Sequence, residues 1–235
     1  MKNKNRIWII PAVFFAVCCV LNLTGCLIEG DLERCVKPAL MPLLCLSTAS
    51  ALLPKLSDSC SAAKAASLLF CGQLFGFAGD TMLLGNSFPF FAGGIGLFLI
   101  GHIFYICLFG GDSFKGLKAW QWICGIAGGL AVTALLVIVV GVNGVMLLPM
   151  GVYGFVLTML IFSTLCGAVR FGGFWWMLLC GAVLFTFSDT LIAVRNFGNL
   201  SPFMGGFGVM FTYLLAQTLL AAGGVRLTER HILCK

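Results

Sequence analysis

The sequence predicts an all-α polytopic membrane protein, a bundle of eight transmembrane helices that forms a single domain over residues 1–235. Of its residues 60% are hydrophobic and only 9% are charged, whereas a soluble domain carries roughly a quarter charged residues. The apolar residues fall in eight stretches of about 20 residues, each long enough to cross a hydrocarbon core of ~30 Å. The intervals between them are about ten residues or shorter, which leaves no room for a soluble domain.

The eight predicted spans follow one another as alternating apolar runs and short polar breaks. In order they cover residues roughly 7–28, 34–53, 63–84, 89–110, 120–141, 144–166, 173–195 and 202–224. The first follows a basic start, and its residues 23–26, LTGC, also fit a lipoprotein signal that ends in a lipidated cysteine. The second begins after Asp31, which can cap it, and carries Glu33 in its first turn. The sixth contains Pro149 and several glycines.

The distribution of basic residues predicts that both chain ends lie in the cytoplasm, because Lys and Arg are enriched on that side of a membrane. With the N-terminus inside, eleven of the 14 basic residues fall on the cytoplasmic side: Lys2, Lys4, Arg6, Lys55, Lys64, Lys115, Lys118, Arg170, Arg226, Arg230 and Lys235. The other side keeps Arg34, Lys37 and Arg195. This bias favours an ordinary first helix over a cleaved signal. The short loops and the basic start suit a bacterial cytoplasmic membrane, and a eukaryotic internal membrane is the alternative location. It also explains the net charge of +6 without a nucleic-acid partner, because no basic patch is interleaved with aromatic residues.

Cysteine and histidine usage predicts neither disulfides nor a metal site. The twelve cysteines lie mostly inside the spans and form no CxxC pair, which is typical of small packing residues. Only two histidines exist, and His231 lies in the C-terminal tail, so a multi-histidine zinc site is not available. We expect no cofactor and no metal.

Two acidic residues stand inside apolar spans, in similar local sequence. Asp80 lies in LFGFAGDTMLLG and Asp189 in LFTFSDTLIAV, on the third and seventh spans. An intramembrane charge costs on the order of 3 kcal/mol, so it usually faces the bundle interior and has a function. Both acids lie about five or six residues from the predicted outer end of their span, or roughly 7–9 Å deep. A structural carboxylate is the alternative, which the recurrence of the motif disfavours. The remaining acids fall at or beyond the predicted span ends: Glu29, Asp31, Glu33, Asp58, Asp112 and Glu229.

Other polar residues interrupt the apolar faces. Lys37 stands six residues after Asp31, the expected cap of the second helix, and beside Pro38, where it can either snorkel to the headgroups or meet a counter-ion or phosphate. His102 and Tyr105 are three residues apart on one face of the fourth span, with His102 about thirteen residues from the outer end and so deeper than the two acids. Tyr213 and Gln217 are four apart on the eighth. Core packing or interhelical hydrogen bonding is the alternative role for these residues.

Five segments in order resemble the YhhN family, which includes the TMEM86-type lysoplasmalogenases. They are KPALMPLL at Lys37, GFAGDTMLL around Asp80, FFAGGIGLFLIGHIFY ending in Tyr105, FTFSDTLIA around Asp189 and YLLAQTLL with Gln217. The resemblance implies an eight-helix membrane hydrolase that cleaves the vinyl ether of a lysoplasmalogen to a fatty aldehyde and a glycerophospho-alcohol. It implies Asp80 and Asp189 as the catalytic pair. Around them it implies a polar site of Lys37, His102, Tyr105, Tyr153, Ser188, Tyr213 and Gln217.

Two carboxyl groups suit the implied reaction. Vinyl ether hydrolysis begins with proton transfer to the β-carbon and gives an oxocarbenium ion that water captures, a problem related to the one glycosidases solve with a carboxyl pair. Two acids in an apolar surrounding can share one proton near neutral pH, and the sequence does not assign acid and base between them. Ionisable residues also line proton-coupled transport paths. A transporter is therefore an alternative, and a non-catalytic lipid-binding membrane protein is another.

Overall fold

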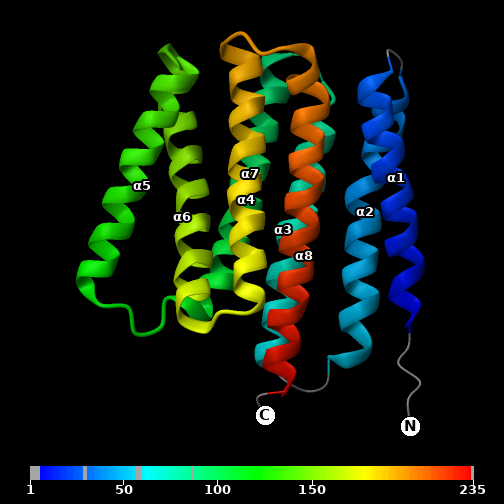
Figure 1. Cartoon of the computed structure of the whole chain (residues 1–235), viewed down its shortest axis with the longest axis vertical. Helices are drawn as coiled ribbons and strands as arrows, with labels where there is room; N and C mark the ends of the chain where they lie inside the picture. Colours follow the sequence, from blue (N-terminus) through cyan, green and yellow to red (C-terminus); the bar gives the residue numbers. More distant parts are fainter. Residues whose placement is uncertain (1–5, 29–30, 57–59, 86, 234–235) are drawn as a thin grey trace. The chain divides into compact units, whose positions relative to one another are not determined.

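The computed structural model describes residues 6–28, 31–56, 60–85 and 87–233. The charged residues Lys2, Lys4, Glu29, Asp58 and Lys235, on which the predicted topology partly depends, lie outside the described residues. Within the described part, regular structure is entirely helical. The eight long helices are α1 (Ile9–Leu27), α2 (Leu32–Leu52), α3 (Cys60–Met82), α4 (Phe88–Ser113), α5 (Ala119–Val140), α6 (Leu147–Phe171), α7 (Phe174–Phe197) and α8 (Val209–Leu233) (Figure 1).

Each of these eight helices is long and apolar enough to cross a membrane. The prediction of an all-α protein with eight membrane-spanning helices is therefore confirmed, and the chain is an integral multi-pass membrane protein. The described residues group into two compact units, one of residues 1–104 with 221–235 and the other of residues 105–220. Each is described by itself below.

In the first unit, α1 and α2 form a hairpin that packs backbone against backbone. A Cβ atom on Gly25 would lie 2.6 Å from the backbone nitrogen of Glu33, so only glycine permits this approach. Asn22 also links the two helices, because its Nδ2 donates to the Glu33 carbonyl oxygen over 3.2 Å. Figure 1 shows the two helices side by side in blue.

The expectation that the Asp31 side chain caps α2 is wrong. Asp31 occupies the N-cap position, but its side chain makes no capping hydrogen bond. Its backbone angles, φ −84° and ψ 2°, differ from the extended conformation in which an N-cap side chain reaches the free N–H groups of the first turn. Glu33 does lie in the first turn, as expected.

Glycines also bring α3 and α4 together, at two levels seven residues apart. A Cβ on Gly101 would lie 3.1 Å from the Gly72 carbonyl oxygen, and one on Gly94 would lie 3.3 Å from that of Gly79. Small residues let membrane helices approach closely and gain van der Waals contact. At the second level, the ring of Phe98 covers Gly79, with two ring carbons 2.9 Å from the position of an added Cβ. This contact adjoins Asp80.

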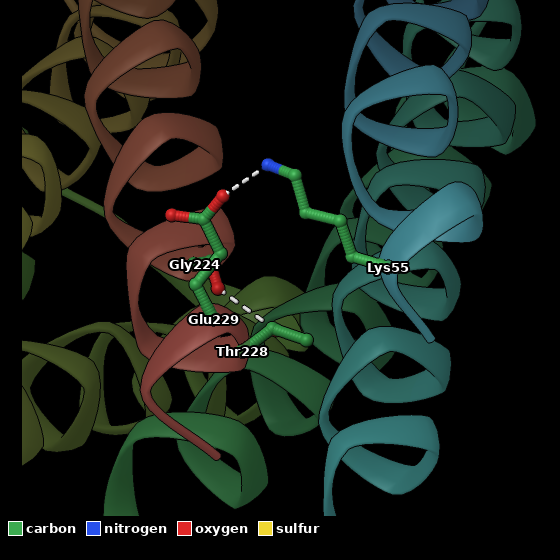
Figure 2. A network of polar contacts seen from close by, with 4 residues as sticks. All are labelled: Lys55, Gly224, Thr228 and Glu229. Atoms are coloured by element: carbon green, nitrogen blue, oxygen red, sulfur yellow. Dashed lines mark hydrogen bonds and ion pairs between the residues drawn. The ribbon is translucent and has the colours of Figure 1, made fainter. Parts of the chain in front are cut away.

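The C-terminal part of α8 belongs to the first unit and packs against α3. A Cβ on Gly224 would lie 2.7 Å from Cδ1 of Leu69, and Thr228 Oγ1 donates to the Gly224 carbonyl oxygen over 2.9 Å. The residue after Thr228, Glu229, forms an ion pair with Lys55, which follows α2 (Figure 2). The two side chains are 50% and 36% exposed, so solvent screens the pair and it contributes at most about 1 kcal/mol.

The end of α8 corrects the predicted end of the eighth span at residue 224. The helix continues to Leu233, so Arg226, Glu229 and Arg230 lie on the helix rather than beyond it. Hydropathy marks where the apolar stretch ends, whereas Leu, Glu and Arg all favour helix and continue it past that point.

In the second unit, α5, α6 and α7 pack consecutively (Figure 1). The turn between α6 and α7 consists of Gly172 and Gly173, with φ of 61° and 58°, a region that side chains disfavour. The hairpin closes tightly, because a Cβ on Gly167 would lie 1.9 Å from Cε3 of the fully buried Trp175. Similarly, Gly125 of α5 lies under the ring of Phe162 of α6.

A π-helical turn (Met204–Gly208) leads into α8. Arg195, near the end of α7, donates from its guanidinium to the Gly205 carbonyl oxygen over 2.9 Å. Ser188, two turns earlier, donates to the Val209 carbonyl oxygen over 3.1 Å. Both bonds tie the start of α8 to α7.

Candidate functional site

Asp189 of α7 is held by Tyr153 of α6. The hydroxyl of Tyr153 donates a hydrogen bond to Oδ2 of Asp189. Both side chains are buried, with exposed fractions of 5% for Asp189 and 2% for Tyr153. The glycine turn that closes the α6–α7 hairpin brings these residues together across 36 positions of sequence. The resemblance named both residues as members of one site, and the structure places them in direct contact.

A second hydrogen-bonded chain in the same unit joins three of the expected residues. Tyr105 donates to Oε1 of Gln217, and Nε2 of Gln217 donates to the Tyr213 hydroxyl, each over 3.3 Å. The amide of Gln217 thus uses its acceptor and its donor on two tyrosines and fixes the direction of the chain. Tyr213 also packs edge-on against Phe185, with ring centroids 5.5 Å apart.

Ser188 forms a hydrogen bond to the backbone and none to another residue of the expected site. Its hydroxyl donates to the Val209 carbonyl oxygen, at the point where α8 begins. Because Ser188 directly precedes Asp189, this bond fixes the section of α7 that carries the acid. A positioning role for Ser188 follows.

A small cavity lies beside Asp189, between α5, α6 and α7. Its volume is about 30 Å³. The polar part of its lining consists of Asp189, Tyr153, Thr133 and Thr190, and the apolar part includes Leu136, Val137, Met150 and Leu157. A buried carboxyl group therefore borders both a polar wall and a hydrocarbon wall, an arrangement suited to a reaction at the polar end of a lipid chain.

Asp80 lies in the first unit and is likewise buried, with 6% of it exposed. The preceding residue, Gly79, accepts the Phe98 ring against its Cα. The α3 helix ends at Met82, two residues after Asp80, and turn-type hydrogen bonds continue to Gly85, five residues after Asp80. Asp189 lies eight residues before the end of α7 at Phe197. The helix ends therefore do not reproduce the expected count of six for Asp189, because α7 continues past the predicted end of its span.

Two further residues implied by the resemblance belong to the first unit. His102 of α4 is fully buried, with its ring centroid 6.4 Å from that of Phe98, the residue that covers Gly79. Lys37 is half-buried in the second turn of α2, the helix that packs against α1. Lys37 thus stands on the α1–α2 hairpin.

Three polar residues near the two acids were not predicted from the sequence. Thr133 and Thr190 line the cavity beside Asp189. Thr133 is the only hydroxyl residue in the fifth apolar stretch, a signal that was available. Gln73, which is buried on α3 and accepts a hydrogen bond from Thr48 over 2.8 Å, lies two turns before Asp80 and so on the same helix face.

The described residues contain no group of side chains arranged as metal ligands and no disulfide bond. No three His, Cys, Asp or Glu side chains gather there as metal ligands would. The eleven described cysteines are free thiols, and five of them, Cys35, Cys60, Cys107, Cys124 and Cys180, lie on exposed helix faces rather than in the core.

The model of the YhhN family matches residues 32–224, from the start of α2 well into α8. The chain belongs to the YhhN family. The matched segment of this YhhN-family protein includes both intramembrane aspartates and every supporting residue named above. The resemblance stated from five short segments is confirmed at the level of the family. No solved structure matches the chain.

Proposed function

We propose that this YhhN-family protein is a membrane hydrolase that cleaves the vinyl ether bond of a lysoplasmalogen. The products would be a fatty aldehyde and a glycerophospho-alcohol. The observation that carries the proposal is the buried Asp189 carboxyl group, hydrogen-bonded by Tyr153 and bordered by an apolar cavity wall inside a membrane protein of this family. A carboxyl group at that border is the group that acid–base chemistry on a lipid's ether bond requires.

In the proposed mechanism, Asp80 and Asp189 act as a pair. One carboxyl group delivers a proton to the β-carbon of the vinyl ether, and the other, as carboxylate, stabilises the oxocarbenium ion or activates water. The chain from Tyr105 through Gln217 to Tyr213, and His102 in the first unit, would support the polar end of the substrate. No step requires a metal or a nucleotide.

The proposed location is a bacterial cytoplasmic membrane with both chain ends in the cytoplasm. Under that topology, Lys37 and Arg195 lie near the outer surface, where either can meet the substrate phosphate. Arg195 already donates to Gly205, which favours Lys37 for this role. Lys37→Ala is then expected to raise the apparent KM for a phosphorylated substrate several-fold. Unchanged turnover and unchanged apparent affinity in detergent would contradict the assignment.

The hydrolase proposal is tested by aldehyde release from a vinyl-ether lysophospholipid by purified protein in detergent. We expect turnover by wild type and a loss of at least ~10²-fold in Asp80→Asn and in Asp189→Asn, because each removes a group that transfers protons. Asp112→Asn is the matched control, since Asp112 forms an ion pair with Lys115 near the end of α4 and is outside the proposed site. An alkyl-ether analogue, which lacks the double bond, should not react.

Two outcomes contradict the hydrolase. Aldehyde release by both aspartate variants at the wild-type rate would exclude the catalytic pair. Absence of turnover of any ether lipid, together with uptake into liposomes driven by a pH gradient, would identify a proton-coupled transporter.

A further inference from the structure

The cavity beside Asp189 has the size and the polar partners that one buried water molecule requires. Its volume of about 30 Å³ exceeds the roughly 10–15 Å³ that a cavity needs to hold one water, and such a water needs about two to four polar partners. Four polar side chains line this cavity: Tyr153, Asp189, Thr133 and Thr190. All four come from α5, α6 and α7 within one compact unit.

The hydroxyl protons around the cavity are already used in hydrogen bonds. Thr133 Oγ1 donates to the Gly129 carbonyl oxygen and Thr190 Oγ1 to that of Thr186, each over 2.8 Å. Tyr153 donates its proton to Asp189. A hydroxyl that donates its only proton keeps its oxygen lone pairs as acceptors. The polar wall therefore offers acceptors, so a water molecule in the cavity would direct its two protons to this wall and a lone pair toward the apolar side.

We propose that Asp189 is the carboxylate that activates the hydrolytic water, and that Thr133 and Thr190 are positioning residues that orient this water. The assignment rests on the proposed hydrolase function and deepens it, because it leaves proton delivery to the substrate carbon to Asp80. The hydrogen bond from Tyr153 stabilises Asp189 as a charged carboxylate, the form that accepts a proton from water.

The step balances without any further reactant. Asp80 gives its proton to the β-carbon, and the double-bond electrons form the new C–H bond and leave an oxocarbenium ion. The water oxygen then bonds to the carbon beside the ether oxygen while Asp189 takes one water proton. The resulting hemiacetal breaks its bond to the glycerol oxygen, which receives the hemiacetal hydroxyl proton. One water is consumed, one aldehyde and one alcohol form, and the proton on Asp189 replaces the one lost by Asp80 through exchange with solvent.

Thr133 and Thr158 provide a matched pair of variants for the test. Both are buried threonines, 7% and 6% exposed, and each donates to a backbone carbonyl oxygen over 2.8 Å, Thr133 to that of Gly129 and Thr158 to that of Phe155. Only Thr133 lines the cavity. Thr133→Val keeps the shape and removes the hydroxyl, so we expect kcat for the vinyl-ether lysophospholipid to fall about 10-fold with little change in KM. Thr158→Val should stay near wild type, and Thr133→Ser, which restores the hydroxyl, should recover most of the rate.

A second readout separates water placement from general structural damage. Thr133→Ala enlarges the cavity, so added methanol should compete with water for the oxocarbenium ion and give a mixed methyl acetal. We expect the ratio of acetal to aldehyde to rise several-fold in Thr133→Ala and not in Thr158→Ala.

The outcomes distinguish this inference from the function on which it rests. If wild type releases aldehyde but the Thr133 variants match the Thr158 variants in both rate and methanol partition, the hydrolase stands and the water assignment is overturned. If wild type releases no aldehyde, both are overturned. Slower turnover in Thr133→Val with rescue by Thr133→Ser and altered methanol partition in Thr133→Ala supports the assignment.

Discussion

Asp80 and Asp189 follow similar residues in sequence, yet the residues directly before them on α3 and α7 make different contacts. The residue before Asp80 is Gly79, whose missing side chain admits the Phe98 ring at 2.9 Å from the Cβ position. The residue before Asp189 is Ser188, which donates to the Val209 carbonyl oxygen, and Asp189 itself accepts from Tyr153. Gly79 is thus packed against an aromatic ring, whereas Ser188 and Asp189 are held by hydrogen bonds. Two carboxyl groups in unlike surroundings suit two different tasks, proton donation and water activation.

Among the variants that test this difference, Tyr153→Phe is expected to have the largest effect on catalysis. The substitution removes the hydroxyl that donates to Asp189 and changes nothing else in the side chain. A hydrogen bond to a charged group contributes about 1.5–3 kcal/mol, so kcat/KM for the vinyl-ether substrate should fall roughly 10- to 100-fold. The measurement is aldehyde release at several substrate concentrations.

Tyr105→Phe is the control for that variant. The Tyr105 hydroxyl donates to the neutral amide of Gln217, and a neutral bond contributes about 1 kcal/mol, so its loss should cost no more than about 5-fold. Equal effects of the two substitutions would mean that the bond to Asp189 has no special weight in the reaction.

A smaller effect, on stability rather than chemistry, is expected on the α3 side from Gly79→Ala. The added methyl group would meet the Phe98 ring and force it or α3 to shift, at a cost of about 1–3 kcal/mol. Thermal unfolding in detergent measures this as a lower Tm. Gly96→Ala on α4 is the control, because nothing lies within 4 Å of its Cβ position. A Tm for Gly79→Ala at or above that of Gly96→Ala would show that packing at Phe98 does not hold this section of α3.

The smallest effect is expected away from both acids, from Lys55→Ala. This substitution removes the ion pair with Glu229, whose side chains are 50% and 36% exposed, so we expect no change in turnover and a stability loss below about 1 kcal/mol. That loss should shrink as salt is added. Lys64→Ala, at an exposed lysine of α3, is the reference. A larger loss of turnover than in Tyr153→Phe would contradict the placement of the chemistry at the buried acids.

Much of the fold could be predicted because the hydropathy of a segment depends only on its local sequence. Runs such as residues 120–141 contain almost no polar group, and such a run can cross a membrane only as a helix with its backbone bonds satisfied internally. Helix ends were less predictable: α8 continues through Arg226 and Glu229 to Leu233, because charged residues favour helix as readily as apolar ones.

The candidate site was predictable in membership and not in arrangement. Asp80 and Asp189 stand out because an acid inside an apolar stretch is costly, and the structure finds both of them buried. Their partners do not stand out in this way. Tyr153 lies 36 residues from Asp189, and Gln217 lies 112 residues from Tyr105, so neither pairing leaves a local pattern.

The sequence by itself determined that this protein is a helical membrane protein of the YhhN family with two aspartates inside its spans. Only the tertiary structure decided that Tyr153 donates to Asp189, and that Thr133 and Thr190 border a water-sized cavity beside it. The physical reason is that the cost of burying a charge is paid residue by residue and can be read along the chain. Hydrogen-bond partners and cavities depend on how glycine contacts such as Gly167 on Trp175 set the approach and rotation of neighbouring helices.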